Sequence, residues 1–194
     1  MINCEYIFPT PIWSFFYNLD VNLIEEKIYN LKNLSDGRVV SNINGWQSSD
    51  YYMIDSETFQ LSSFFNFISK NIPIFLESFG TKNKSLQVDN FWFNVNSISS
   101  FNKPHIHAGS FLSGVMYIKV PDNSGNIIFH RSSSDQYILY SNISNASGIC
   151  GYTSWKYKPE ECKCIIFPSW ISHEVEINEN QNDRISIAFN LSWK

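Results

Sequence analysis

The sequence predicts a mainly β protein, a β-sandwich or jelly roll, with two or so helices packed outside one sheet. From Leu86 onward, short apolar or alternating segments are separated by turn-like stretches such as PDNSG and NENQND. Two segments with helical periodicity precede them. Hydrophobic residues make up 43% of the 194 residues and aromatic residues 16%, which is enough to fill the core of one domain.

Residues 1–85 are expected to form an N-terminal support for the sheets. The segment IFPTPIW is typical of an edge strand that prolines interrupt. Asp20 is a suitable N-cap for a first helix, and Gly37 lies beyond the end of that helix. A second helix is expected within residues 56–80, with Pro73 bending or restarting it. The apolar faces of the two helices would consist of Ile24, Ile28 and Leu31, and of Leu61, Phe64, Phe65 and Ile68.

Residues 86–194 are expected to form the jelly-roll core, and the whole chain, 1–194, is interpreted as one domain. The expected strands lie, in chain order, in LQVDNFWFNVN, FLSGVMYIKV, GNIIFHRS, YTSWKYK, KCIIFPSW, SHEVEIN and RISIAFNLSW. Between the third and fourth of these, residues 132–151 are polar and rich in Ser and Asn. Loops of this length often serve as lids or substrate loops, and such a role is expected here.

Charge and composition argue against several classes of partner. The net charge is −4 and no basic cluster is longer than a pair, so a nucleic-acid partner is not expected. The stretch MINCEYIFPTPIWSFFY has no cationic start and contains Glu5, Pro9 and Pro11, so we expect neither a signal peptide nor a membrane-spanning segment. The four cysteines do not form a disulfide framework, which indicates a cytoplasmic protein.

Two of the four histidines, His105 and His107, lie one residue apart just before an apolar run. They could be packing residues, a pH switch or half of a metal site. Side chains at positions i and i+2 of a strand project from the same face, so both could reach one metal ion. A third donor would come from His130 or His173, and the local pattern leaves that choice open.

An arginine begins the last expected strand, RISIAF. Arg184 and Ser186 would share one face of this strand and could point into the barrel. A buried arginine requires an anionic partner, and a guanidinium beside a hydroxyl suits a carboxylate. Taken alone, an arginine in a strand is more often a surface residue. Together with the histidines, it favours a carboxylate-bearing ligand next to a metal ion.

This combination resembles the Fe(II)/2-oxoglutarate-dependent oxygenases, in particular a family found in phages and marine bacteria and related to the prolyl hydroxylases. The resemblance is carried by GWQS at 45–48, FWFNVN at 91–96, PHIHAGSFLSGVMYIKVP at 104–121, IIFPSWISHEVE at 165–176 and RISIAFN at 184–190. It implies a double-stranded β-helix, which is the cupin-like form of the jelly roll. It also implies a location in the cytoplasm of a bacterial cell, or of the host cell if a phage encodes the protein.

The resemblance implies three ligands of Fe(II): His105, His107 and His173. It implies three donors to the C5 carboxylate of the co-substrate 2-oxoglutarate: Arg184, Ser186 and Tyr117. Asn94 would help to line the pocket, and Trp46 would either shape the entrance or belong to the core. The implied reaction is hydroxylation of a small molecule or peptide, with release of succinate and carbon dioxide. A homodimer is compatible with the sequence.

One residue departs from the common pattern of this superfamily, which surrounds iron with two histidines and one carboxylate. His107 stands at the carboxylate position. Three neutral imidazoles would leave the full charge of +2 on the metal, which should strengthen the binding of dianionic 2-oxoglutarate. Three histidines with an open position are also a catalytic zinc arrangement. The alternatives are therefore a three-histidine zinc-dependent hydrolytic enzyme and a catalytically silent jelly-roll binding protein.

Overall fold

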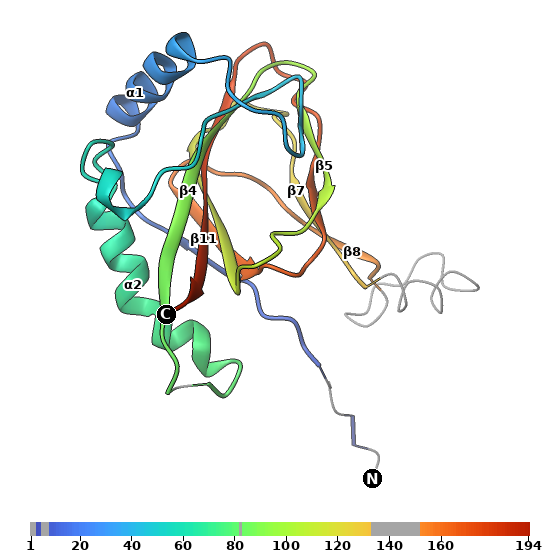
Figure 1. Ribbon diagram of the computed structural model, residues 1–194. Coiled ribbons are helices and arrows are strands. Elements are labelled where there is room, and N and C mark those ends of the chain that lie inside the picture. The colour runs from blue at the N-terminus through green and yellow to red at the C-terminus, as the bar shows by residue number, and fades with distance from the viewer. Residues whose placement is uncertain (1–2, 5–7, 82, 133–151) are drawn as a thin grey trace.

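The computed structural model describes residues 3–4, 8–81, 83–132 and 152–194 of the chain. It consists of two antiparallel sheets, with two helices packed outside one of them (Figure 1). The helices are α1 (Val21–Leu34) and α2 (Ser62–Glu77), with a short 3-10 helix, η1 (Met53–Asp55), between them. The predicted fold class is confirmed.

The two sheets have six and five strands. The larger has the order β1 (Trp13–Phe16), β9 (Lys163–Pro168), β6 (Leu112–Lys119), β11 (Arg184–Trp193), β4 (Leu86–Asn96) and β3 (Trp46–Gln47). The smaller has the order β2 (Asn42–Ile43), β5 (Phe101–His105), β10 (His173–Val175), β7 (Ile127–His130) and β8 (Ser154–Tyr157). From β4 to β7, and again from β8 to β11, consecutive strands alternate between the sheets. This connectivity is that of a jelly roll.

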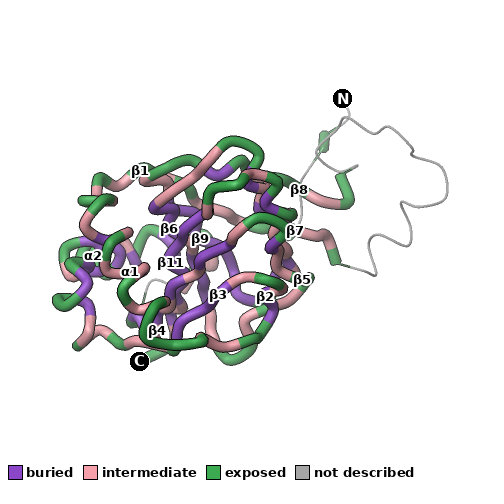
Figure 2. The backbone as a smooth tube through the Cα atoms, turned by 90° about the horizontal axis from the view of Figure 1, so that it is seen from above, coloured by how far each residue is buried: buried purple, intermediate pink, exposed green. Residues whose placement is uncertain are grey.

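The central strands β4 and β11 each have one apolar and one largely polar face. Their apolar faces pack with the buried faces of α1 and α2, and they consist of Phe91, Phe93, Val95, Ile185, Ile187, Phe189 and Leu191. The opposite faces line a cavity between the sheets, and they consist of Asn90, Trp92, Asn94, Asn96, Arg184, Ser186, Ala188 and Asn190. Seen from above, buried stretches run along β6, β9, β11 and β4 (Figure 2). The two-residue period of a strand thus separates the core from the cavity.

The helices agree with the sequence in their apolar faces, and the start of α2 differs from the expectation. Asp20 caps α1 as predicted, because its Oδ1 accepts a hydrogen bond from the N–H of Leu23 at 3.2 Å. The helix ends at Leu34, so Gly37 lies beyond its end, as expected. α2 begins at Ser62 rather than near Ser56, since residues 56–60 form turns. Pro73 was expected to bend or restart α2, and it does not restart the helix, because it lies inside an uninterrupted helix.

Three short strands lie outside the segments that were expected to form strands: β2, β3 and β5. β5 reads FNKPH, which contains a proline and shows no alternation of buried and exposed residues. The first strand starts at Trp13, after both prolines of the segment expected to form it, and it is an edge strand as predicted.

The predicted lid falls on residues 132–151, of which 133–151 lie outside the described residues. In the described parts of the chain, no helix has the length and apolar character needed to cross a membrane.

Gly114 in β6 provides a test of the packing between the larger sheet and the helices. A Cβ atom at this position would lie 2.2 Å from Cζ of Phe189, whose ring is fully buried. We expect Gly114→Ala to lower the free energy of unfolding by about 1–3 kcal/mol, because an overpacked core must shift. Denaturant unfolding measures this loss. The loss should be smaller in a Phe189→Leu background, and an equal loss in both backgrounds would contradict the explanation.

Candidate functional site

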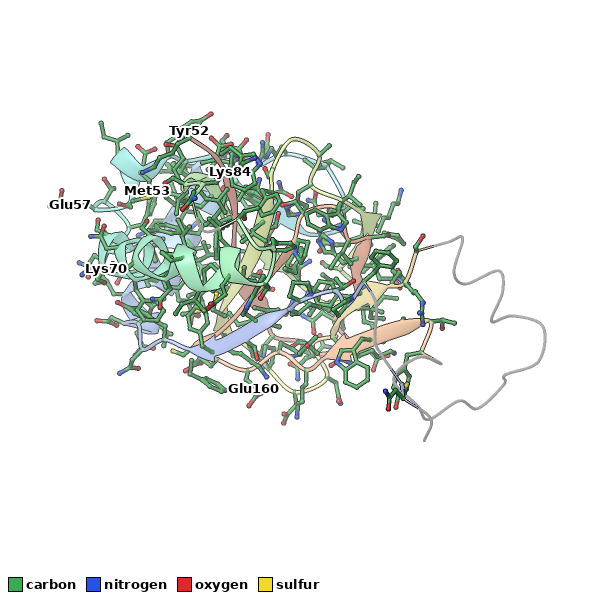
Figure 3. All side chains as sticks on the ribbon, turned by 90° about the horizontal axis from the view of Figure 1, so that it is seen from below. Tyr52, Met53, Glu57, Lys70, Lys84 and Glu160 are labelled. Atoms are coloured by element: carbon green, nitrogen blue, oxygen red, sulfur yellow. The ribbon has the colours of Figure 1, made fainter. Side chains whose placement is uncertain are left out.

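The cavity between the sheets contains all the residues singled out by the sequence except Trp46 and His130. Its volume is about 270 Å³, and β3, β4, β5, β6, β10 and β11 all contribute to its lining. A second cavity of about 630 Å³ lies beside η1 and α2, where Tyr52, Met53 and Lys84 border it (Figure 3). Among the described residues, His105, His107 and His173 form the only group that could hold a metal ion. The cavity between the sheets is therefore the candidate site.

The smaller sheet and the segment that follows β5 bring the three histidines together. His105 ends β5 and is paired directly with His173, the first residue of β10. His107 lies two residues beyond β5, where its N–H donates to the carbonyl of Ser169 at 2.9 Å. The prediction that His105 and His107 occupy one strand is therefore wrong. One ring nitrogen from each histidine nevertheless lies within 4.8 Å of the corresponding nitrogens of the other two.

Hydrogen bonds determine which nitrogen of each ring is free. Nδ1 of His105 lies 2.7 Å from the carbonyl oxygen of Lys103, and Nδ1 of His173 lies 3.0 Å from that of Ile171. Nδ1 of His107 lies 2.8 Å from Oδ1 of Asn190. These oxygens can only accept, so each Nδ1 carries the proton and each Nε2 is unprotonated. Such hydrogen bonds are typical of metal-ligating histidines. Nε2 of His105 also lies 3.5 Å from Oγ of Ser41.

Burial keeps the three rings in the neutral form that a metal ion requires. It lowers the pKa of His173, which is 3% exposed, to about 3, and the neighbouring His105 and His107 contribute to the shift. Burial likewise lowers the pKa of His107 to about 4 and reduces the pKa of His105. At neutral pH the cavity therefore presents three unprotonated imidazole nitrogens.

The fourth histidine faces away from this group. Nε2 of His130 lies 3.1 Å from Oε1 of Glu174, on neighbouring strands of the smaller sheet. Glu174 follows His173 directly, and its side chain projects to the opposite face of β10. Asp50, whose carboxylate does border the cavity, forms an ion pair with Arg38. Among the described residues, therefore, no carboxylate group lies beside the three histidines.

Arg184 is a buried cation in the same cavity. Its residue is 2% exposed, and Nη1 donates to the carbonyl oxygens of Ser124 and Gly125. Within the described residues, no carboxylate lies within ion-pair distance of its guanidinium group. A buried guanidinium without an anionic partner costs stability unless a ligand supplies the negative charge. The position of Arg184 therefore suits an anionic ligand.

Three of the predicted co-substrate residues form a row across neighbouring strands. Ser186 of β11 is paired with Asn94 of β4 on one side and with Tyr117 of β6 on the other. No hydrogen bond joins any of these three side chains to a described residue, and all three border the cavity. Burial raises the pKa of Tyr117 to about 12, so its hydroxyl stays protonated and able to donate.

Several cavity residues had no recognisable pattern in the sequence. Arg38 and Asp50 form a two-pronged ion pair at the border of the cavity, and Nη1 of Arg38 lies 2.9 Å from Oδ2 of Asp50. Gln47 extends the row of Asn94 onto β3. Its neighbour Trp46 does not shape the entrance: it packs in the core, and its Nε1 donates to the carbonyl of Ser35 at 2.8 Å. The GWQS motif could have indicated Gln47, because a neighbour of a core residue in a strand faces the other way.

The sequence between residues 90 and 190, more than half of the chain, matches the model of a family described as "Putative 2OG-Fe(II) oxygenase". The chain belongs to this family. The metal ion of this oxygenase is Fe(II), and its co-substrate is 2-oxoglutarate. No curated protein matches the sequence.

Solved structures share the fold of this oxygenase at low sequence identity. A prolyl-4-hydroxylase from Pseudomonas putida superposes with a TM-score of 0.63 and 10% identity, over 95% of this chain and 94% of that one. The epimerase SnoN from nogalamycin biosynthesis gives 0.60 and 14%, over 94% and 76%. A collagen prolyl hydroxylase from Paramecium Bursaria Chlorella virus-1 gives 0.56 and 12%, over 93% and 94%. These likenesses show the jelly-roll fold.

Proposed function

We propose that this oxygenase hydroxylates its substrate, with His105, His107 and His173 as the ligands of Fe(II). Arg184 is the proposed partner of the C5 carboxylate of 2-oxoglutarate. The single observation that carries the proposal is the shared cavity: three unprotonated imidazole nitrogens and one buried guanidinium without a carboxylate partner among the described residues border the same space. A metal ion and a dianion would satisfy both.

The three histidines suit Fe(II) in chemistry as well as in position. Imidazole is a good ligand for iron, and three donors leave open positions for a co-substrate. The Nδ1 hydrogen bonds fix the rings, so that binding a metal requires little further ordering of the side chains. Three neutral ligands also leave the +2 charge of the metal ion uncompensated, which favours a dianionic co-substrate.

The other end of the proposed co-substrate is assigned to the larger sheet. The guanidinium of Arg184 would form a charge-assisted contact with the C5 carboxylate. Ser186 and Tyr117, whose hydroxyls have no partner among the described residues, would add neutral hydrogen bonds. Asn94 continues this row and would border the co-substrate or the substrate.

Bound Fe(II) and 2-oxoglutarate supply the oxidising chemistry, in which O2 converts 2-oxoglutarate to succinate and carbon dioxide and a substrate C–H bond to C–OH. The protein's own residues hold and orient the reactants. The histidines fix the metal, Arg184 fixes the far end of the co-substrate, and the two sheets exclude water from the space between them. The proposed substrate is a small molecule or a peptide. We propose neither a nucleic acid nor a membrane as partner, and a homodimer is compatible with the proposal.

Two alternatives use the same histidines. A zinc-dependent hydrolytic enzyme would use the metal ion to activate water, and a silent binding protein would use no chemistry at all. The hydrolytic alternative does not explain why Arg184 is buried without an anionic partner among the described residues. Metal analysis of protein purified anaerobically, paired with an assay for succinate release, separates the three. Bound iron with release of succinate supports the proposal, whereas zinc without succinate release, or neither metal nor turnover, would refute it.

Tyr117→Phe tests the neutral part of the co-substrate site. We expect this variant to bind 2-oxoglutarate more weakly by about 1 kcal/mol, or roughly fivefold, because one neutral hydrogen bond is lost. Calorimetric titration of 2-oxoglutarate under anaerobic conditions measures the change. Tyr157→Phe is a matched control, since Tyr157 lies in β8 and does not border the cavity. An equal effect of both variants would remove Tyr117 from the site.

His107→Asp would restore the common set of two histidines and one carboxylate. A carboxylate neutralises one charge of the metal ion, which favours metal binding. However, the side chain of Asp is shorter than that of His, so its oxygen would not reach the position of Nε2. A misplacement of about 1 Å can reduce a rate by up to about a hundredfold. We therefore expect His107→Asp to retain some iron and to release succinate slowly. Full activity of this variant would show that the site accommodates a carboxylate. Unchanged iron content and activity in His107→Ala would show that His107 is not a ligand.

A further inference from the structure

The side chain of Asn190 in β11 contacts His107, 83 residues away in the sequence. Its Oδ1 lies 2.8 Å from Nδ1 of the histidine. Asn190 is the last residue of the RISIAFN segment, and it lies on the cavity face of its strand. It lies six positions after Arg184 in the strand, so this end of the cavity face is remote from the proposed site of the C5 carboxylate.

Neighbouring strands hold the amide of Asn190 in one orientation. Nδ2 donates to Oδ1 of Asn90 at 2.9 Å, and Asn90 is the register partner of Asn190 in β4. Oδ1 accepts from Oγ of Ser113 at 2.8 Å, and Ser113 is the register partner in β6. Oγ of Ser113 also lies 2.7 Å from Oγ of Ser169. These contacts turn the oxygen of the amide, rather than its nitrogen, toward His107.

His107 depends on this side chain in a way that the other two histidines do not. His105 and His173 direct Nδ1 at backbone carbonyls two residues before them, so their own chain orients them. His107 lies outside any strand, and its Nδ1 has only the amide of Asn190 as a hydrogen-bond partner among the described residues. The rings of Trp92 and Phe167 lie 5.5 and 6.2 Å from its ring, and such packing does not distinguish the two nitrogens.

We infer that Asn190 is a positioning residue for the third metal ligand. By accepting from Nδ1, it fixes the tautomer of His107 and directs Nε2 at the other two histidines. Asn90 and Ser113 support this role by holding the amide. The inference rests on the proposed function, because it requires that His107 binds the metal ion.

The test compares Asn190→Ala, which removes the acceptor, with Asn190→Asp, which retains one. The first measurement is nitrogen-15 NMR of the imidazole rings in metal-free protein, because it reports the tautomer without enzymatic turnover. The second is anaerobic titration with Fe(II). We expect Asn190→Ala to give a mixture of tautomers at His107 and roughly a ten- to hundredfold loss of Fe(II) affinity. Asn190→Asp should restore the Nδ1–H tautomer and most of the affinity.

Two further variants keep the test decisive. Ser192→Ala in the same strand, whose hydroxyl donates to Asp89, is the matched control and should change neither measurement. Asn90→Ala leaves Asn190 in place and removes the acceptor that orients its amide. It should produce a mixture of tautomers of the same kind, which tests the inference even if Asn190→Ala does not fold.

The possible failures are distinguishable. If His107→Ala loses Fe(II) while Asn190→Ala and Asn90→Ala keep both the tautomer and the affinity of the parent protein, the positioning role is refuted and the proposed function stands. If His107→Ala binds Fe(II) as tightly as the parent protein, the ligand assignment fails and the inference fails with it. Failure of Asn190→Asp to restore the tautomer would also overturn the role of Asn190 as an acceptor.

Discussion

Arg184→Ala is expected to weaken the binding of 2-oxoglutarate by about 2–5 kcal/mol, since truncating one partner of a buried charge pair costs this much. The guanidinium is almost fully buried, and its other contacts are backbone carbonyls that cannot compensate a carboxylate. Iron content should remain near that of the parent protein, because Arg184 contacts none of the histidines. Anaerobic calorimetry with Fe(II)-loaded protein measures the loss.

Two controls make this result interpretable. Arg184→Lys keeps a positive charge but loses the planar pair of donors, so its loss of affinity should be smaller than that of Arg184→Ala. Lys119→Ala removes a cation at the end of β6 that forms an ion pair with Glu25 outside the cavity, and it should have no effect. Thermal unfolding of each variant shows whether the fold is retained. Equal affinity of folded Arg184→Ala and the parent protein would place the co-substrate elsewhere.

Replacing any one of His105, His107 and His173 by Ala is expected to reduce Fe(II) affinity by more than about a hundredfold. Removing a group that merely orients a ligand already costs roughly ten- to a hundredfold, and here a ligand itself is lost. His130→Ala is the matched control, because that ring forms a hydrogen bond with Glu174 and does not belong to the triad. Anaerobic titration with Fe(II) measures all four variants. A similar loss at all four positions would contradict the assignment of the ligands.

The sequence was most informative where a strand has two different faces. RISIAFNLSW alternates regularly, so both its packing against the helices and the cavity face of Arg184 and Ser186 could be predicted. LQVDNFWFNVN behaves in the same way only from Phe91 to Val95, because a shift in its pairing with β11 places Leu86 and Val88 in the same core. The two-residue period needs no knowledge of the rest of the chain. The cap of α1 at Asp20 was also predictable without knowledge of the rest of the chain, because the contact spans only three residues.

Features that depend on distant contacts could not be predicted. β5 contains a proline and lacks alternation, so its place between β2 and β10 comes from pairing with residues far along the chain. His107 was expected in the strand of His105, yet the chain leaves β5 before it and bonds to Ser169. The contact of Asn190 with His107 and the ion pair of Arg38 with Asp50 follow from tertiary packing. A single sequence contains no periodic signal for any of them.

The central claim is that one cavity joins a three-histidine iron site to a 2-oxoglutarate site at Arg184. The most direct test is a crystal structure of the protein grown anaerobically with Fe(II) and 2-oxoglutarate, with the metal located by its anomalous scattering. We expect one iron ion bound by Nε2 of His105, His107 and His173, and the C5 carboxylate paired with the guanidinium of Arg184. Iron bound at another place, or 2-oxoglutarate bound without contact to Arg184, would contradict the claim.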